Sequence, residues 1–120
     1  MILEDIVAEN TDIISRFADN GLNLNLKREF TFSVVLDSKE ECESLRSDLR
    51  TEGKLRDLCV KQKLESGAFI VSSGPKDEQP ELVYMIDMQP KVEVISEIEL
   101  ILLYASRSYP DAEVFWEFKE

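Results

Sequence analysis

The spacing of hydrophobic positions identifies the elements around which this chain is built. Between residues 92 and 106, apolar side chains recur at the i, i+3, i+4, i+7 spacing of a helix, bounded by Pro90 and Pro110. Period-two segments lie on either side of it, at residues 82–88 and 114–118. The pattern predicts a strand, a helix and a strand in succession. Leu100 and Leu103 widen the apolar stripe, so we expect this helix to pack against more than one neighbour.

The first part of the chain predicts a helix, a strand and a second helix. Residues 2–19 place apolar side chains on one broad face, interrupted at Asn10, and Gly21 provides a suitable stop. Residues 30–36 alternate as a half-buried strand does. Ser38 and Glu41 then fit the capping box of a helix that runs to Gly53.

The middle of the chain is ambiguous. Leu58, Val60 and Leu64 alternate with polar residues, which predicts a strand over residues 55–64. A second apolar run at residues 68–72 either continues that strand beyond a bulge or forms a separate edge strand. The loop at residues 74–80 carries strong turn signals and should close a hairpin into the strand at residues 82–88.

These elements predict an α+β fold, a ferredoxin-like β-α-β-β-α-β sandwich with an additional N-terminal helix. We expect one domain over residues 1–120, with the N-terminal helix in residues 1–20 and the sandwich in residues 29–118. Right-handed crossovers would place the first and third strands at the centre of the sheet. The side chains expected to face the two later helices are Phe30, Phe32, Val34, Leu36, Tyr84, Ile86, Met88, Val114, Trp116 and Phe118.

The opposite face of the predicted sheet carries Val35, Val83, Met85 and Phe115. These side chains are too apolar to be left wholly in water, and the N-terminal helix needs a surface to pack against. We therefore expect that helix to cover part of this face. The alternative is that a second copy of the chain covers it.

Charge is the compositional feature that bears most on partners. The chain has 120 residues and a formal net charge of −11. Phosphates and anionic lipids repel such a protein, so we expect no direct nucleic acid and no membrane as partner, whereas a basic protein surface attracts it. The alternative is that the acids only keep the surface soluble. Acidic residues also stand where a signal peptide has its basic flank, so we expect a cytoplasmic protein.

The residues give little support to catalysis. The chain contains no histidine, the commonest general base and transition-metal ligand, and its four glycines form no phosphate-binding loop. Cys42 and Cys59 form neither a disulfide framework nor a metal-binding spacing, so we expect them to be reduced and buried. We expect no catalytic residue, no cofactor and no metal, and therefore no enzyme.

The last strand carries the candidate binding residues. Its phase places Glu113, Phe115 and Glu117 on one side, and Asp87 joins them if the preceding strand shares that face. An aromatic anchor within a rim of carboxylates suits a basic protein partner. The alternative is that Glu113 and Glu117 prevent this edge from pairing with other strands. Trp116 has the opposite phase, which favours the core.

Several local patterns resemble those of a known family. An N-terminal helix ends in NGLNL, a strand of alternating phenylalanines follows, and the next helix opens with SKEE and closes with EG. The last strand carries acids and a tryptophan. In these features the chain is similar to the regulator of ribonuclease E activity B family, which are small acidic bacterial inhibitors of an RNA-degrading enzyme.

This resemblance implies a non-catalytic acidic regulatory protein that binds and inhibits or modulates a ribonuclease E-like endoribonuclease. Two other functions suit the same residues. One is an immunity protein that neutralises a basic toxin nuclease, and the other is a small-molecule-sensing ferredoxin-like dimer. Both a monomer and a homodimer are compatible with the sequence.

Overall fold

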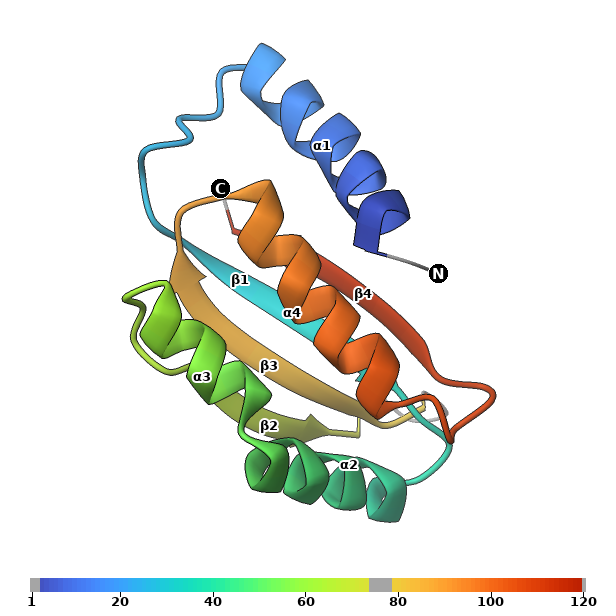
Figure 1. The fold of residues 1–120 in the computed structure, drawn as a ribbon. Helices are drawn as coiled ribbons and strands as arrows, with labels where there is room; N and C mark the ends of the chain where they lie inside the picture. The colour runs from blue at the N-terminus through green and yellow to red at the C-terminus, as the bar shows by residue number, and fades with distance from the viewer. Residues whose placement is uncertain (1–2, 74–78, 120) are drawn as a thin grey trace.

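The fold consists of four helices and four strands within the part of the chain that a computed structural model describes, residues 3–73 and 79–119 (Figure 1). The elements in chain order are α1 (Leu3–Asp19), β1 (Arg28–Val35), α2 (Lys39–Glu52), α3 (Lys54–Lys61), β2 (Ala68–Ser72), β3 (Glu81–Met88), α4 (Val92–Ala105) and β4 (Glu113–Phe118).

The four strands form one sheet in the order β2-β3-β1-β4, and every neighbouring pair is antiparallel. The predicted central position of the first and third strands is therefore confirmed. Two helical crossovers, α2–α3 and α4, connect the strands as in a ferredoxin-like sandwich. The expected α+β fold with an additional N-terminal helix is correct.

The helix α2 begins and ends where the sequence predicts. The Ser38 hydroxyl accepts a hydrogen bond from the Glu41 amide at 3.2 Å, while the Glu41 carboxylate accepts one from the Asp37 amide at 3.1 Å. At the other end Gly53 adopts a left-handed conformation with φ of 68°, which costs glycine little because it has no Cβ. The chain turns there and immediately begins a further helix.

That further helix contradicts the strand predicted for residues 55–64. Residues 54–61 form α3, with Leu55, Leu58 and Cys59 buried and Val60 73% exposed. The alternation of Leu58, Val60 and Leu64 was misleading, because the buried positions are spaced by three and four residues. Lys63, with φ of 57°, then ends the helical segment.

The run at residues 68–72 is a separate edge strand, β2, which was one of the two alternatives. It pairs with β3 in the register Ile70↔Val83, as a hairpin requires. The predicted connecting loop, residues 74–80, falls mainly on residues 74–78, which lie outside the described residues.

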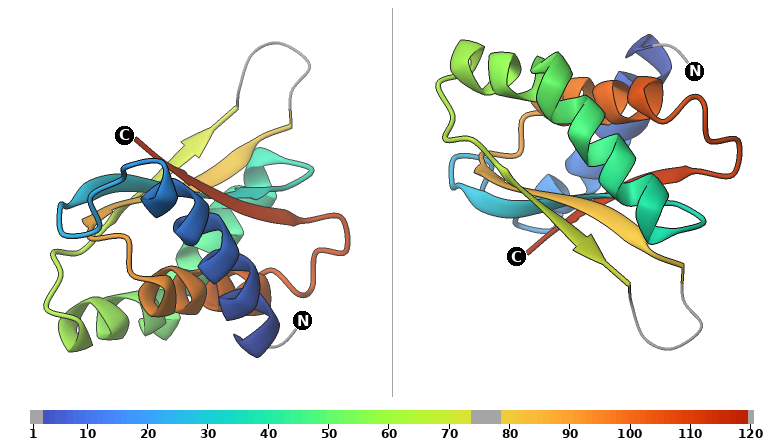
Figure 2. Two further views of the ribbon diagram at one scale, coloured as in Figure 1. Left: turned by 90° about the horizontal axis from the view of Figure 1, so that it is seen from above. Right: turned by 90° about the horizontal axis from the view of Figure 1, so that it is seen from below.

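All four helices lie on the same side of the sheet (Figure 2). The prediction that α1 covers the opposite face is wrong, because α1 packs alongside α4. The buried side chains of α1 are Ile6, Asn10 and Ile14. The polar one, Asn10, donates hydrogen bonds to Ser96 and Glu99 on α4.

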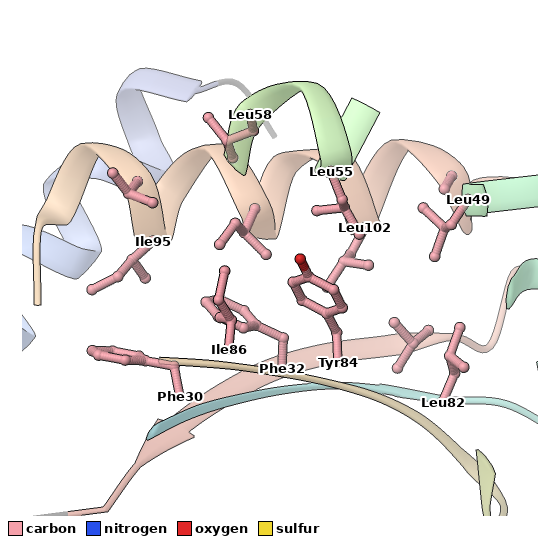
Figure 3. Packing of buried hydrophobic residues seen from close by; sticks show 14 of the residues in the cluster. Phe30, Phe32, Leu49, Leu55, Leu58, Leu82, Tyr84, Ile86, Ile95 and Leu102 are labelled. Carbon is pink, nitrogen blue, oxygen red and sulfur yellow. The ribbon is translucent and has the colours of Figure 1, made fainter. Parts of the chain in front are cut away.

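The core fills the space between the helices and one face of the sheet (Figure 3). Phe30 and Phe32 of β1 are completely buried beneath α4, where Ile95 and Ile98 are at most 1% exposed. As expected from its wide apolar stripe, α4 contacts more than one neighbour: it packs against α1, α2, α3 and β4. The helix between residues 92 and 106 is thus the centre of the helical layer.

Candidate protein-binding surface

The face of the sheet that points away from the helices is the first candidate surface, and we call it the helix-free face. Across it, the strand register aligns Ile70 of β2, Val83 of β3, Ser33 of β1 and Phe115 of β4 in one row. Ile70 is 47% exposed and Phe115 is 42% exposed, whereas Val83 between them is half-buried. Ser33 interrupts the row but is only 3% exposed, so the row presents mainly apolar side chains. We call this row the apolar band, and it is most exposed at its two ends.

Carboxylates surround this band. The side chains of the helix-free face that carry negative charge are Glu29, Glu81, Asp87, Glu113 and Glu117. Lys119 follows in the same phase, and its ammonium lies 3.2 Å from the Glu29 carboxylate. The charge of this face is thus strongly negative, and a positively charged surface complements it.

All four predicted binding residues lie on the helix-free face. Glu113 and Glu117 flank Phe115 on the same strand at intervals of about 7 Å, so these three form one group. Asp87 lies two strands away and two residues further along the register from Glu117, the nearest carboxylate of the group, at a distance of about 12 Å. That distance exceeds the screening length of about 8 Å at physiological ionic strength, so Asp87 acts separately from the group.

The sequence interpretation missed the other end of the apolar band. Ile70 belongs to β2, and its position opposite Val83 depends on the pairing of β2 with β3. The sequence alone leaves open whether residues 68–72 form a separate strand. Glu29 and Glu81 were also missed as members of the acidic rim. Glu29 precedes the buried Phe30, and Glu81 precedes the buried Leu82. The period-two pattern therefore indicates that both glutamates lie on the face opposite the core.

The helical side of β4 carries a buried polar cluster that links α1, α4 and β4. The Asn10 amide nitrogen donates to the Ser96 hydroxyl at 3.1 Å and to the Glu99 carboxylate at 3.3 Å. The indole nitrogen of Trp116 donates to the Asn10 carbonyl oxygen at 3.0 Å. Asn10 is 2% exposed, so its amide uses both its donors and its acceptor inside the protein.

Burial raises the pKa of Glu99, and the hydrogen bond from Asn10 opposes that shift. Glu99 is 9% exposed and lies on the same helix as the core residues Ile95 and Ile98. A carboxylate in this position is costly to desolvate, and the Asn10 amide offsets part of that cost. Asn10, which interrupts the apolar face of α1 in the sequence, thus contributes a polar contact to the docking of α1 on α4 and β4.

Trp116 has the core phase that the sequence predicts, but it is half-buried. Its ring packs near Phe30 and Phe118, with centroid distances of 5.9 and 6.3 Å. Its exposed part faces a groove between α1 and β4, which we call the α1/β4 groove.

The α1/β4 groove has a volume of about 600 Å³. Helix α1 meets β4 through the bond between Asn10 and Trp116 and through an edge-to-face contact of Phe17 with Phe118, with ring centroids 4.9 Å apart. The residues that line the groove are Glu9, Asn10, Ile13, Phe17 and Glu99, together with residues 114–118 of β4. Consecutive residues of one strand line it because the groove runs along the outer edge of β4.

Two thiols and one phenol elsewhere, those of Cys42, Cys59 and Tyr84, are built into the core. Cys42 and Cys59 are buried and not joined by a disulfide, as expected, and burial raises the pKa of the Cys42 thiol, which keeps it protonated. The Tyr84 hydroxyl accepts from the Gly67 amide at 3.2 Å and lies 3.5 Å from the Cys59 sulfur. Burial also raises the pKa of Tyr84, so the phenol is neutral.

No group of three or more histidine, cysteine, aspartate or glutamate side chains in residues 3–73 and 79–119 could hold a metal ion. Within the same residues, no helix combines the length and hydrophobicity needed to cross a bilayer.

Comparisons with known proteins bear on the fold alone. No family model matches the chain, and no curated protein does. Among solved structures, the chain is similar to a de novo designed protein with a ferredoxin fold, determined by solution NMR. The two share 15% sequence identity with a TM-score of 0.46, over 79% of this chain and 86% of the designed one. The strand order and crossovers described above identify the chain as a ferredoxin-like α+β protein.

Proposed function

We propose that this protein is a non-catalytic acidic regulator that binds a basic protein surface through its helix-free face. The observation that carries the proposal is the exposed apolar band, with Ile70 and Phe115 at its ends, inside a rim of carboxylates. Exposed aromatic and aliphatic anchors surrounded by charge are typical of protein interfaces. Lysine and arginine side chains of the partner would pair with the carboxylates of this rim.

A ribonuclease E-like endoribonuclease is the partner that the sequence resemblance favours. An enzyme that binds RNA presents basic surfaces, and an acidic protein docked on one would compete with RNA for it. The group of Glu113, Phe115 and Glu117 would contribute charge and an anchor at one edge of the interface. Ile70 would anchor the opposite edge.

Binding to a purified ribonuclease E-type endoribonuclease tests this function. We expect Phe115→Ala and Ile70→Ala each to raise the Kd about tenfold or more, equivalent to about 1.4 kcal/mol. Val60→Ala is the matched control, because Val60 on α3 is an aliphatic side chain exposed on the helical side of the protein. RNA cleavage measured in the same samples should recover in proportion to the loss of binding.

Two results would contradict the proposal. One is an endoribonuclease that does not bind the protein, while a basic toxin nuclease does, which would support the immunity function instead. The other is a chain that is dimeric, becomes monomeric on Ile70→Ala or Phe115→Ala, and binds neither nuclease. That outcome would identify the helix-free face as a contact between two copies, as the sensing-dimer alternative requires.

A further inference from the structure

The outer edge of β4 exposes a regular set of backbone hydrogen-bonding groups. The Lys119 amide donates to the Glu29 carbonyl at 3.1 Å, which makes these opposed residues a hydrogen-bonded pair. In an antiparallel pair such residues alternate with ones whose N–H and C=O groups point the other way. The backbone groups of Val114, Trp116 and Phe118 therefore point away from β1.

These outward groups lie beside the α1/β4 groove. β4 is the last strand of the sheet, so its outer edge has no neighbouring strand within the described residues. An edge of this kind is a template for an added strand. The side chains of Val114, Trp116 and Phe118 project on the same side as α1, where Ile13 and Phe17 form the facing wall.

We propose that the α1/β4 groove binds an extended peptide segment of a partner protein, which adds to β4 as a fifth strand. The volume of about 600 Å³ lies within the range of ligand-binding clefts. The backbone of the segment pairs with Val114, Trp116 and Phe118, and every second side chain enters the groove. The free edge and the groove thus act as one site.

The chemistry on the two sides of β4 specifies the segment. On the groove side, Ile13, Phe17 and Trp116 select apolar side chains. On the helix-free side, Glu113 and Glu117 project from the same strand and select lysine or arginine. The lining of the groove includes Glu9, Glu99 and Glu117 and, within the described part of the chain, no lysine or arginine. The segment is therefore one that alternates apolar and basic residues.

Backbone amide exchange tests this proposal directly. The probe is a synthetic peptide that alternates valine and arginine and matches the six residues of β4 in length. With the peptide near saturation, we expect the amides of Val114, Trp116 and Phe118 to exchange about tenfold more slowly. The amides of Phe115 and Glu117 should change little, because they already bond to β1. Fluorescence of Trp116, the single tryptophan, provides a second signal.

Two controls separate strand addition from simple attraction of charges. N-methylation of the peptide amides that face β4 should abolish binding, whereas N-methylation of the alternate amides should leave it intact. In the protein, Ile13→Lys should weaken binding at least tenfold. Val60→Lys is the control, because it makes the same kind of change at an exposed aliphatic residue of α3. It should weaken binding by no more than one added charge does.

The proposal fails if the peptide N-methylated at the amides that face β4 binds as well as the parent peptide. It also fails if methylation of the alternate amides abolishes binding, or if the β4 amides gain no alternating protection. It also fails if those amides become protected with rising protein concentration and no peptide, because two copies would then be pairing edge to edge. Ile70→Ala distinguishes this site from the helix-free face: it should leave peptide binding unchanged, since Ile70 lies on β2 at the opposite edge of the sheet.

Discussion

The two faces of the sheet belong to the same four strands but differ in burial. On neighbouring strands, Phe32 is completely buried beneath the helices, whereas Phe115 on the helix-free face is 42% exposed. The helical side is closed by α4 with α1, α2 and α3 around it, and the other side is closed by nothing in the described chain (Figure 2). One face therefore stabilises the fold, whereas the other has no covering helix within the described residues.

The largest difference between the faces should appear on truncation of these two phenylalanines. Phe32→Ala removes a completely buried ring, so we expect a loss of about 3–5 kcal/mol in the free energy of unfolding. Phe115→Ala, its matched control, should cost about 1 kcal/mol or less. Urea denaturation of both variants measures the contrast. Equal losses would mean that the helix-free face is as much a part of the core as the helical face.

The second prediction concerns the polar contact that joins α1 to α4 and β4 on the helical side. Asn10→Leu leaves the Trp116 indole nitrogen without its acceptor and removes the donor from Glu99. We expect a loss of about 1–3 kcal/mol, because buried polar groups without partners are costly. Asn25→Leu, at an exposed position, should lie within about 0.5 kcal/mol of the parent chain. An Asn10→Leu protein as stable as the parent would show that apolar packing alone holds α1.

The third prediction uses the raised pKa of Glu99. The carboxyl group holds its proton more tightly in the folded state than in the unfolded state. Its contribution to stability is therefore fully present below the usual glutamate pKa of about 4.3. That contribution is lost as pH rises through the pKa of the folded state. Glu99→Gln removes the ionisation and retains an acceptor for Asn10. The variant should therefore gain stability relative to the parent at neutral pH, and the difference should shrink towards pH 4.

Denaturation midpoints measured from pH 4 to pH 8 test this expectation. Glu97→Gln, the same substitution on the same helix at a less buried side chain, provides the control for the loss of one negative charge. A Glu99→Gln protein whose stability relative to the parent does not vary with pH would contradict the inference that burial disfavours the charged form.

The smallest effect on stability is expected for charge reversal on the helix-free face. Glu113→Lys combined with Glu117→Lys should change the free energy of unfolding by about 0.5 kcal/mol or less, because both side chains are exposed. The variant should nevertheless associate more slowly with a basic partner and with a weaker dependence on salt. Phe115→Ala should instead speed dissociation and leave the salt dependence alone. Stopped-flow rates across a salt series separate the two effects.

Local signals in the sequence determined several elements of this protein. The capping box at Ser38 and Glu41 and the stop at Gly53 delimit α2 through bonds within a few residues, so they need no tertiary information. The period-two segments predicted β1, β3 and β4, and right-handed crossovers then placed the first and third strands at the centre of the sheet. The phase of β4 likewise placed Glu113, Phe115 and Glu117 together on one face.

The tertiary structure decided what these local patterns leave open. Residues 54–61 fit both a strand and a helix, and burial of Leu55, Leu58 and Cys59 against the core selected the helix. Helix α1 lies on the helical side, where Asn10 has its hydrogen-bonding partners more than eighty residues away in the chain. The α1/β4 groove and the row from Ile70 to Phe115 exist only once distant strands are in register. Periodicity reports which face of an element is buried, but the surface that buries it is chosen by packing and hydrogen bonding between elements far apart in sequence.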